Sequence, residues 1–507
     1  MRDVKAMPDM SADRGPRAAG GSPDDIVFVI PPSRWRDSRY SLGVMYVSSY
    51  LRKNGYGNAI IDDRIMGKRR FSSDEAMKAI VRRIGAMRPR FVGVTCLINE
   101  LREAVEVVKA VKAESPGTTV LAGGTQPTDT PGIFLRNGVD YVVLGEGEAT
   151  TLELINKLDS GKPPDEVRGI AFLSRGKVRL TGPRPLMEDL DEIPYPSFDL
   201  VNMERHLDFH EWVLRGLPMK TGLVMTSRGC PYSCTFCECN KLFGRKVRHR
   251  SYGNIYGEVK LLRDMYGAEA IWFVDDTLTL DKGHLFMVCR IMRELGMRWA
   301  CQGRVNTVDD EMIRVMKSSG CIQIDFGVES GSDRVLRDII DKRITTSQTR
   351  EAFRLCRKHG MRTLANIMIG LPTETREEML KTYSLAREIG ANSYVLSITL
   401  PLPNTRLWDI VDPDISEDEM YKLNFFDSEL LPRFNRSGVK DLVSLRKAML
   451  TMLNNHRKLG KTLSLAEWYA RIFHGTKHKG GFIRYIAGSY LNFAYAVVGR
   501  LRRELAP

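Results

Sequence analysis

The sequence predicts an α/β protein with three parts: an N-terminal doubly wound parallel-sheet domain, a partial (β/α)6 barrel and a helical C-terminal region. Three observations lead to this prediction. Short apolar segments alternate with helix-like segments early in the chain, the same alternation resumes near residue 221, and a proline-rich stretch separates the two series. Such alternation favours parallel strands that helices cover on both faces. The 507 residues are also too many for one ordinary core, so two or three domains are expected.

The first domain is expected over residues 24–160, after a polar segment (1–23) that lacks an apolar core and is expected to be disordered. Between two of its strands, Leu101 and Val105 recur on one face of a predicted helix, with Asn99 as its candidate N-cap. Five parallel strands with intervening helices predict a doubly wound sheet. The strands are predicted at 26–30, 59–62, 91–95, 118–122 and 141–144.

Glycine-rich turns follow the last two of these strands, at the edge where a doubly wound sheet binds its ligands. They are Gly123-Gly124-Thr125 and Gly145-Glu146-Gly147-Glu148. Glycine lets a ligand approach the backbone closely, although ordinary turn chemistry is the alternative for each single glycine. The spacing differs from G-x-G-x-x-G, so no dinucleotide-binding fingerprint is predicted.

A linker is predicted over residues 161–220, because prolines interrupt regular structure there and acidic residues gather among them. The second domain is expected over residues 221–410, and residues 411–507 are expected to form the helical C-terminal region. Six βα units are too few for an eight-fold barrel and indicate an open, partial barrel with its site at the carboxyl ends of the strands. The six strands are predicted at 222–226, 270–274, 299–303, 322–327, 364–368 and 393–397.

The strongest chemical signal is a CxxxCxxC motif, formed by Cys230, Cys234 and Cys237, directly after the first strand of the predicted barrel. Three thiolates on one loop can hold three irons of a 4Fe–4S cluster and leave the fourth iron with an open position. A zinc site completed by Cys239 or His249 is one alternative, but zinc sites prefer separated CxxC pairs and no second pair exists. A ferredoxin-type site would need its fourth cysteine at another spacing. Cys239 is therefore expected to be a bystander.

This motif, placed after the first strand of a six-unit barrel, resembles that of the radical S-adenosylmethionine (SAM) superfamily, and Phe236 matches the aromatic residue usual before the third cysteine. The resemblance implies that the open iron chelates SAM and that one electron cleaves SAM to methionine and a 5′-deoxyadenosyl radical. It also implies SAM contacts at the strand ends, with a structural salt bridge as the alternative for the arginine. The implied residues are Asp275 and Asp276 for the amino group, Arg304 for the carboxylate, Glu329 or Ser330 for the ribose and Gly370 for adenine.

A doubly wound domain before such a barrel resembles the cobalamin-dependent subfamily, which carries its corrinoid on a Rossmann-like domain. The cofactor contacts that the resemblance implies are Gly123, Gly124, Thr125, Gly145 and Gly147. Residues 1–205 contain no histidine, so this domain cannot supply an imidazole to cobalt, and base-off cobalamin near Thr95 or Gln126 is expected. A degenerate domain that binds no cobalamin is the alternative, because the subfamily often has histidine where Gln126 stands.

The leading hypothesis for function is a cobalamin-dependent radical SAM enzyme that methylates an unactivated carbon. Oxidative ring closure or rearrangement with the same cofactors, without methyl transfer, is the alternative within the family. A zinc-binding or nucleic-acid-binding protein is the alternative from another class. It is not favoured, because aromatic residues interleaved with Lys and Arg are absent from the barrel.

The formal net charge of +14 suits acidic partners, and a scattered, solvated excess of charge is the alternative. The implied partners are a small-molecule or lipid-like substrate and an electron donor such as a flavodoxin or ferredoxin; nucleic acid is not expected. Residues 484–503 combine aromatic residues with flanking arginines and could touch an anionic membrane, with an ordinary packed helix as the favoured alternative. No secretory signal is recognised, so a cytoplasmic protein, in possible peripheral contact with the membrane, is expected.

Overall fold

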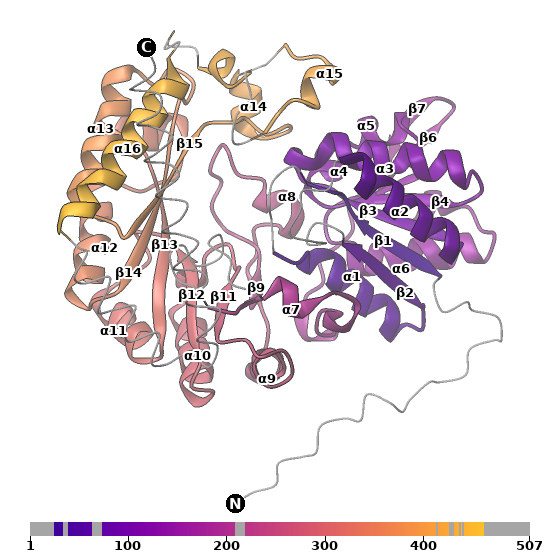
Figure 1. The fold of residues 1–507 in the computed structure, drawn as a ribbon, viewed down its shortest axis with the longest axis horizontal. Coiled ribbons are helices and arrows are strands. Elements are labelled where there is room, and N and C mark those ends of the chain that lie inside the picture. Colours follow the sequence, from indigo (N-terminus) through magenta and orange to yellow (C-terminus); the bar gives the residue numbers. More distant parts are fainter. Residues whose placement is uncertain are drawn as a thin grey trace, which may run out of the picture.

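In the computed structural model, two α/β units lie side by side, one formed by the first part of the chain and the other by the barrel strands (Figure 1). The structure describes residues 25–33, 39–62, 73–207, 219–411, 414–424, 430–435, 438 and 441–460. Within these residues, no helix is long and apolar enough to cross a membrane.

The first unit is built on a seven-stranded sheet in the order β2-β1-β3-β4-β5-β6-β7, whose first five strands are parallel. The order 2-1-3-4-5 places a topological switch point between β1 and β3, where doubly wound sheets open toward a ligand. The strands read as buried apolar runs because helices cover both faces of the sheet. They are β1 (Ile26–Ile30), β2 (Asn58–Asp62), β3 (Phe91–Thr95), β4 (Thr119–Gly123) and β5 (Tyr141–Val143).

Amphipathic helices cover this sheet, as the spacing of apolar residues predicted. They are α1 (Leu42–Lys53), α2 (Ser73–Met87), α3 (Leu101–Glu114), α4 (Thr125–Asp129), α5 (Pro131–Arg136) and α6 (Gly147–Asp159). Helix α3 buries Leu101 and Val105, as expected, but a 3-10 turn over Ile98–Glu100 precedes it. The N-cap position therefore falls on Glu100, and the prediction of Asn99 as the N-cap was wrong.

The stretch 161–220, which was predicted to be a linker, extends the first sheet before it crosses to the barrel. Strands β6 (Ile170–Ser174) and β7 (Lys177–Leu180) pair antiparallel beyond β5. The following proline-rich part lies against the first unit, where Ser197 accepts a hydrogen bond from the buried Ser48 hydroxyl at 2.9 Å. A short helix, α7 (Met203–His206), comes before the barrel.

The second unit is a curved sheet of six parallel strands in the order β15-β14-β13-β12-β11-β8, which is a partial barrel. Side chains that cap their own helices fix several helix starts: Ser251, Asp281, Asp309, Thr345 and Thr375 each accept from a backbone N–H of the first turn. The strands are β8 (Thr221–Val224), β11 (Ala270–Phe273), β12 (Arg298–Gly303), β13 (Cys321–Glu329), β14 (Arg362–Ile369) and β15 (Ser393–Ile398). Outside them lie α9 (Tyr252–Tyr266), α10 (Lys282–Glu294), α11 (Asp310–Ser318), α12 (Thr346–Lys358) and α13 (Arg376–Ile389).

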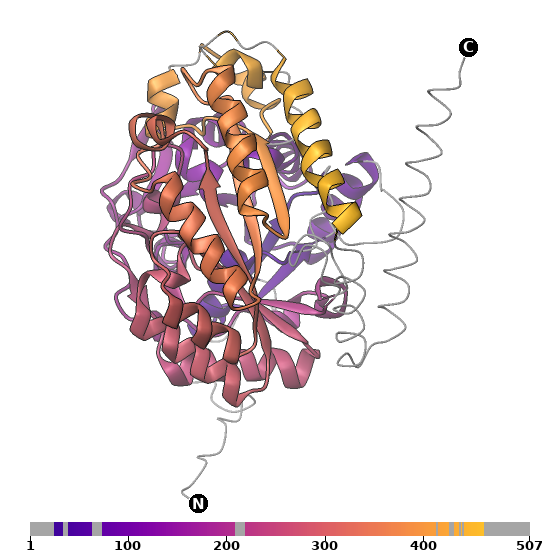
Figure 2. The ribbon, with the colours of Figure 1, turned by 90° about the vertical axis from the view of Figure 1, so that its left-hand side faces the viewer.

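Helix α16 (Leu442–Gly460) continues the outer layer of the barrel beside α13 (Figure 2). Two short helices, α14 (Arg406–Val411) and α15 (Glu417–Met420), lead back toward the first unit. There Glu417 pairs with Arg136 of α5 at 2.8 Å. The C-terminal segment therefore ties the last strand of the barrel to the first unit.

Candidate functional site

The three cysteines of the motif lie on a loop between a short strand, β9 (Ser227–Arg228), and helix α8 (Cys239–Phe243). The loop is fixed at its middle by Thr235, whose N–H donates to the Ile340 carbonyl at 2.9 Å and whose hydroxyl donates to the Ile339 carbonyl at 2.8 Å. The cysteine side chains stay partly or fully exposed, whereas the five cysteines outside the loop and α8 are buried. The loop therefore presents three thiols at its surface.

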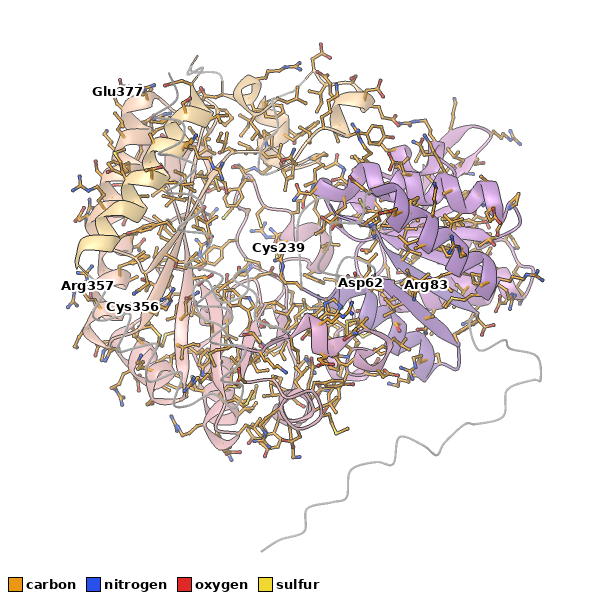
Figure 3. All side chains as sticks on the ribbon, viewed as in Figure 1. Asp62, Arg83, Cys239, Cys356, Arg357 and Glu377 are labelled. Atoms are coloured by element: carbon orange, nitrogen blue, oxygen red, sulfur yellow. The ribbon has the colours of Figure 1, made fainter. Side chains whose placement is uncertain are left out.

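Cys239 lies within hydrogen-bonding reach of Cys230, Cys237 and Asp276. Figure 3 places it between the barrel strands and the first unit. The hydrogen bond from Cys239 lowers the pKa of Cys230 to about 6, because its effect is larger than the opposite effect of burial. The pKa of Cys237 is lowered for the same reason. Thiolates are the form that binds metal, so the donor set has the chemistry that an iron–sulfur cluster requires. Among the described residues, no three His, Cys, Asp or Glu side chains converge as ligands of a single metal ion.

Asp275 anchors the strand end that leads into this loop. Its carboxylate, which is only 1% exposed, accepts from the Thr226 N–H at 3.1 Å, the Thr226 hydroxyl at 2.7 Å and the Ser227 hydroxyl at 2.5 Å. The Thr226 oxygen is also 2.7 Å from Nε2 of His284, a residue that the sequence did not single out. Asp276 instead lies beside Cys239, and burial raises the pKa of both carboxyl groups. Of the two, Asp276 is thus the one beside the cysteine loop.

Arg304 lies against the same loop, with its guanidinium 3.5 Å from the centre of the Tyr232 ring. It also approaches Cys234 Sγ at 3.8 Å and donates to the Lys342 carbonyl. Through these contacts Arg304 holds the cysteine loop against the segment that carries Lys342. Its role toward a SAM carboxylate stays a prediction. Among the described residues, the partners of Arg304 are a ring, a thiol, a carbonyl and the Asn306 side chain, and no carboxylate pairs with it.

Lys342 is a buried cation that sequence reasoning missed. Its ammonium is 2.5 Å from Glu329 Oε1, and both side chains are 8% exposed. Glu329 holds a left-handed backbone conformation (φ of 60°), and a Cβ on Gly327 would collide with both side chains. Lys342 comes after β13 and a π-helical turn (Val335–Ile339) and belongs to no motif, so only the fold brings it to the site. Ser330 is fully buried and contacts Ser332 and Thr382, so it does not share this position with Glu329.

Gly370 ends β14 in a left-handed conformation (φ of 81°). Its N–H and that of Leu371 donate to Glu374 Oε2 at 2.8 and 3.1 Å. Glu374 thereby fixes the turn that is predicted to meet adenine. Burial of Glu374 outweighs these hydrogen bonds and raises its pKa to about 8.

Replacing Glu374 with glutamine is expected to flatten the pH dependence of stability between about pH 4.5 and 8. In this window the folded protein binds a proton that an unfolded chain, with the usual glutamate pKa near 4.5, has lost. Wild-type stability therefore falls as pH rises, by up to about 1.4 kcal/mol per pH unit from this group. Glutamine keeps an acceptor for the two N–H groups but does not titrate. Thermal unfolding midpoints across this range check the expectation, with exposed Glu388→Gln as the control; equal slopes for Glu374→Gln and wild type would contradict it.

The second part of the site is a cavity of about 190 Å³ at the carboxyl ends of β1, β3, β4 and β5. Five residues predicted to contact a cofactor line it together: Thr95, Gly123, Gly124, Gly145 and Gly147. Thr125 begins α4 and is not among the lining residues. Among the described residues that line the cavity there is no histidine.

The glycines of this cavity keep it open. A Cβ on Gly147 would lie 3.0 Å from Val47, and one on Gly93 would meet the Phe28 ring at 2.7 Å. Gly124 has a φ of 101°, which a larger side chain rarely adopts. Because side chains at these positions would intrude on the lining, the glycines leave this volume free for a ligand.

Buried ion pairs join this cavity to the cysteine loop. Arg228, two residues before Cys230, lines the cavity and pairs with Glu148 at 2.6 Å. Glu146 pairs with Arg248 at 2.8 Å. The barrel also contributes Met225, Leu242 and Phe243 to the lining, so the cavity is complete only where the two units meet.

Comparisons with known proteins agree with this geometry. Residues 224–386 match the family model of the Radical SAM superfamily, and residues 38–155 match that of the B12 binding domain. An uncharacterized methyltransferase of Pyrococcus horikoshii is 32% identical over 85% of this chain and 95% of its own length. Cytidylyl-2-hydroxyethylphosphonate methyltransferase of Streptomyces wedmorensis is 29% identical over 76% of this chain and 81% of its own. An anaerobic magnesium-protoporphyrin IX monomethyl ester cyclase of Rubrivivax gelatinosus is 26% identical over 77% of this chain and 69% of its own.

Solved structures share the fold. The radical SAM methyltransferase TsrM from Kitasatospora setae, solved with cobalamin and a [4Fe-4S] cluster, matches with a TM-score of 0.63 at 18% identity, over 76% of this chain and 74% of its own. The cobalamin-dependent radical enzyme OxsB matches with a TM-score of 0.61 at 19% identity, over 78% of this chain and 56% of its own. The predicted pairing of a doubly wound domain with a partial barrel is confirmed.

Proposed function

The chain belongs to the cobalamin-dependent radical SAM family, and on this premise we propose that it methylates an unactivated carbon of a small-molecule or lipid-like substrate. One observation carries the proposal: Arg228 lies two residues before Cys230 and also lines the glycine-framed cavity. The cysteine loop and the cavity are thus adjacent, with the Arg228 side chain between them. The methyltransferase names of the relatives at 32% and 29% identity favour methyl transfer over ring closure.

When bound, the cluster with SAM supplies a radical that removes hydrogen from carbon, and the corrinoid supplies a methyl group. The residues of this chain position these groups and keep water away. Cys230, Cys234 and Cys237 would hold the cluster, and Asp276, which lies beside Cys239, would accept from the ammonium group of SAM. Lys342 and Glu329 form a buried pair beside the cysteine loop and would meet the polar groups of SAM.

Anaerobic reconstitution with iron, sulfide and hydroxocobalamin, followed by metal analysis, tests the cofactors first. The protein is then incubated with a chemical reductant and SAM labelled with a deuterated methyl group. We expect about four irons and one cobalt per chain, release of 5′-deoxyadenosine and deuterium in the bound corrinoid. Release of 5′-deoxyadenosine without labelled corrinoid would discard methyl transfer and favour ring closure. Zinc in place of iron would overturn the whole proposal.

The electron donor is proposed to dock where arginines surround the outer side of the cysteine loop. Arg245 donates to the Pro231 carbonyl and Arg406 to the Ser233 carbonyl, each at 3.0 Å. Both arginines are exposed. Arg406 also pairs with Asp341 at 2.9 Å, whereas Arg245 forms no ion pair with a carboxylate of the described residues. A one-electron carrier with an acidic face, such as a flavodoxin, would therefore be attracted to this surface, where only the cysteine loop would separate it from the cluster.

Replacing Arg245 and Arg406 together with glutamate is expected to slow reduction of the cluster by reduced flavodoxin about tenfold or more at low ionic strength. The reason is electrostatic, so the difference from wild type should shrink as salt is added. Stopped-flow bleaching of the cluster measures the rate, after iron content has been matched. Arg354→Glu, an exposed arginine on α12, is the control. Equal rates at low salt would contradict this docking face.

Contact with an anionic membrane through residues 484–503 stays a prediction, since these residues lie outside the described part of the chain. Flotation with anionic liposomes tests it. Recovery of the protein in the soluble fraction, with and without this segment, would overturn it.

A further inference from the structure

The cavity at the edge of the first sheet is lined mainly by apolar residues. Most of its lining is aliphatic, aromatic or glycine, with side chains from β1, α1, β3, β4 and β5. Its volume is about 190 Å³. An apolar cavity of roughly 150 Å³ holds benzene, so this one has room for a slightly larger ring system. The larger apolar side chains that the first unit contributes are Phe28, Val44, Val47, Val94, Leu121 and Val143.

One polar group in this lining is unsatisfied. Arg228 is 5% exposed, and its Nη2 donates to Glu148 at 2.6 Å. Its Nη1 lies 3.4 Å from Glu146 Oε1 but makes no hydrogen bond. Among the described lining residues, no other side chain has a buried polar atom without a hydrogen-bond partner. A buried N–H without an acceptor is costly, so a ligand that brings one acceptor would be favoured.

The other charged groups of the lining are already engaged. Glu146 accepts from both terminal nitrogens of Arg248 and from the Met187 N–H. The Tyr46 hydroxyl is 3.3 Å from Arg250 Nη1. A ligand ring that enters this cavity therefore meets mostly apolar walls, the hydroxyl groups of Thr95 and Thr151, and one available side-chain N–H donor, that of Arg228.

We propose that Arg228 donates a hydrogen bond to the tail base of the corrinoid, and that the cavity thereby selects a benzimidazole tail over a purine tail. This inference rests on the proposed function, since it needs a corrinoid in the cavity. A dimethylbenzimidazole that has left cobalt offers one acceptor nitrogen, two methyl groups and no donor. Adenine adds an amino group and further ring nitrogens, which would lose their water and face a lining that is mostly apolar.

The proposed bond also keeps the corrinoid base-off. The nitrogen that would coordinate cobalt is the nitrogen that accepts from Arg228, so it cannot do both. The first 205 residues have no histidine to replace it, and the lower face of cobalt stays without a nitrogen ligand from this domain. One arginine thus has two effects, on the choice of tail and on the coordination of cobalt.

The test measures binding rather than turnover. The full chain, reconstituted with its cluster, is titrated anaerobically with hydroxocobalamin, with its adenine-tailed analogue and with diaquacobinamide, which has no tail. Visible absorption and equilibrium dialysis give the three dissociation constants. We expect wild type to bind hydroxocobalamin at least about tenfold more tightly than either competitor. Equal affinity for the two tailed corrinoids would overturn the selectivity, and failure to bind any corrinoid would instead remove the cofactor from the proposed function.

Two matched variants identify the donor. Arg228→Met removes it, whereas Arg248→Met removes a buried arginine of the same ion-pair network that does not line the cavity. The ratio of the affinities for hydroxocobalamin and diaquacobinamide is compared within each preparation, so a smaller folded fraction cancels. We expect this ratio to fall roughly 10- to 100-fold in Arg228→Met and to persist in Arg248→Met. An unchanged ratio in Arg228→Met, or an equal fall in both variants, would overturn the assignment.

Discussion

Replacing Cys237 with alanine is expected to reduce iron after anaerobic reconstitution from about four per chain to less than one, and to abolish release of 5′-deoxyadenosine. Cys237 is the most exposed of the three loop cysteines, so its substitution leaves the core unchanged. A cubane held by three thiolates has no spare ligand on the protein, and the loss of one leaves two irons without a side chain. The expected effect is therefore complete rather than graded.

Cys239→Ala is the matched control. Cys239 is two residues away and within hydrogen-bonding reach of Cys230 and Cys237, yet the motif assigns it no iron. This variant should keep about four irons and the absorption of the cluster. Iron and sulfide analysis, with electron paramagnetic resonance of the reduced protein, distinguishes the two variants. Equal iron loss in both would show that Cys239 is a ligand and would close the coordination position that SAM requires.

Replacing Arg250 with methionine is expected to lower the free energy of unfolding by about 3–5 kcal/mol at neutral pH. Arg250 pairs with Glu258 of α9 at 2.5 Å, and both side chains are almost fully buried. It also donates to the Met225 carbonyl at 2.7 Å, at the strand end before the cysteine loop. Removing the arginine leaves a buried carboxylate without its cation, which is the costly case for an ion pair.

The pH dependence and a double substitution test this cause. Burial already raises the pKa of Glu258 despite Arg250, and loss of the arginine raises it further. The protonated, neutral form is tolerated, so the deficit of Arg250→Met should shrink as pH falls and grow as pH rises. Arg250→Met/Glu258→Met should recover most of the stability, because apolar replacement of a buried pair is often neutral. Urea unfolding at several pH values measures both; a double variant as unstable as the single one would contradict the expectation.

Much of the architecture follows from patterns of short range. The β1 strand is a five-residue run of buried apolar residues, and the cysteine motif comes directly after the first barrel strand, so both are visible without the fold. The glycines at the ends of β4 and β5 were found because parallel strands end at one edge of a sheet. The strands β6 and β7 were missed, because they form an antiparallel pair without an intervening helix and so fall outside the alternation of strands and helices.

The rest of the site depends on contacts between distant residues. Lys342 meets Glu329 across an irregular turn, and His284 reaches Thr226 from a helix 58 positions later. Neither pair has a motif, because the path of the chain after β13 and the packing of α10 on the barrel set these spacings. Arg228 was overlooked for a related reason, as its partner Glu148 lies 80 positions earlier in the other unit.

The completion of the cavity by Met225, Arg228, Leu242 and Phe243 of the barrel unit bears on how such chains can be recombined. A chimera that joined the first unit to the barrel of a relative would carry only part of the pocket wall. The selectivity of such a chimera among corrinoids would then depend on the protein that supplied the strand and loop around Cys230, as much as on the protein that supplied the sheet. A gene fusion made at the proline-rich junction would take the two parts of one binding site from different proteins. Exchanging the two units together would keep the site intact.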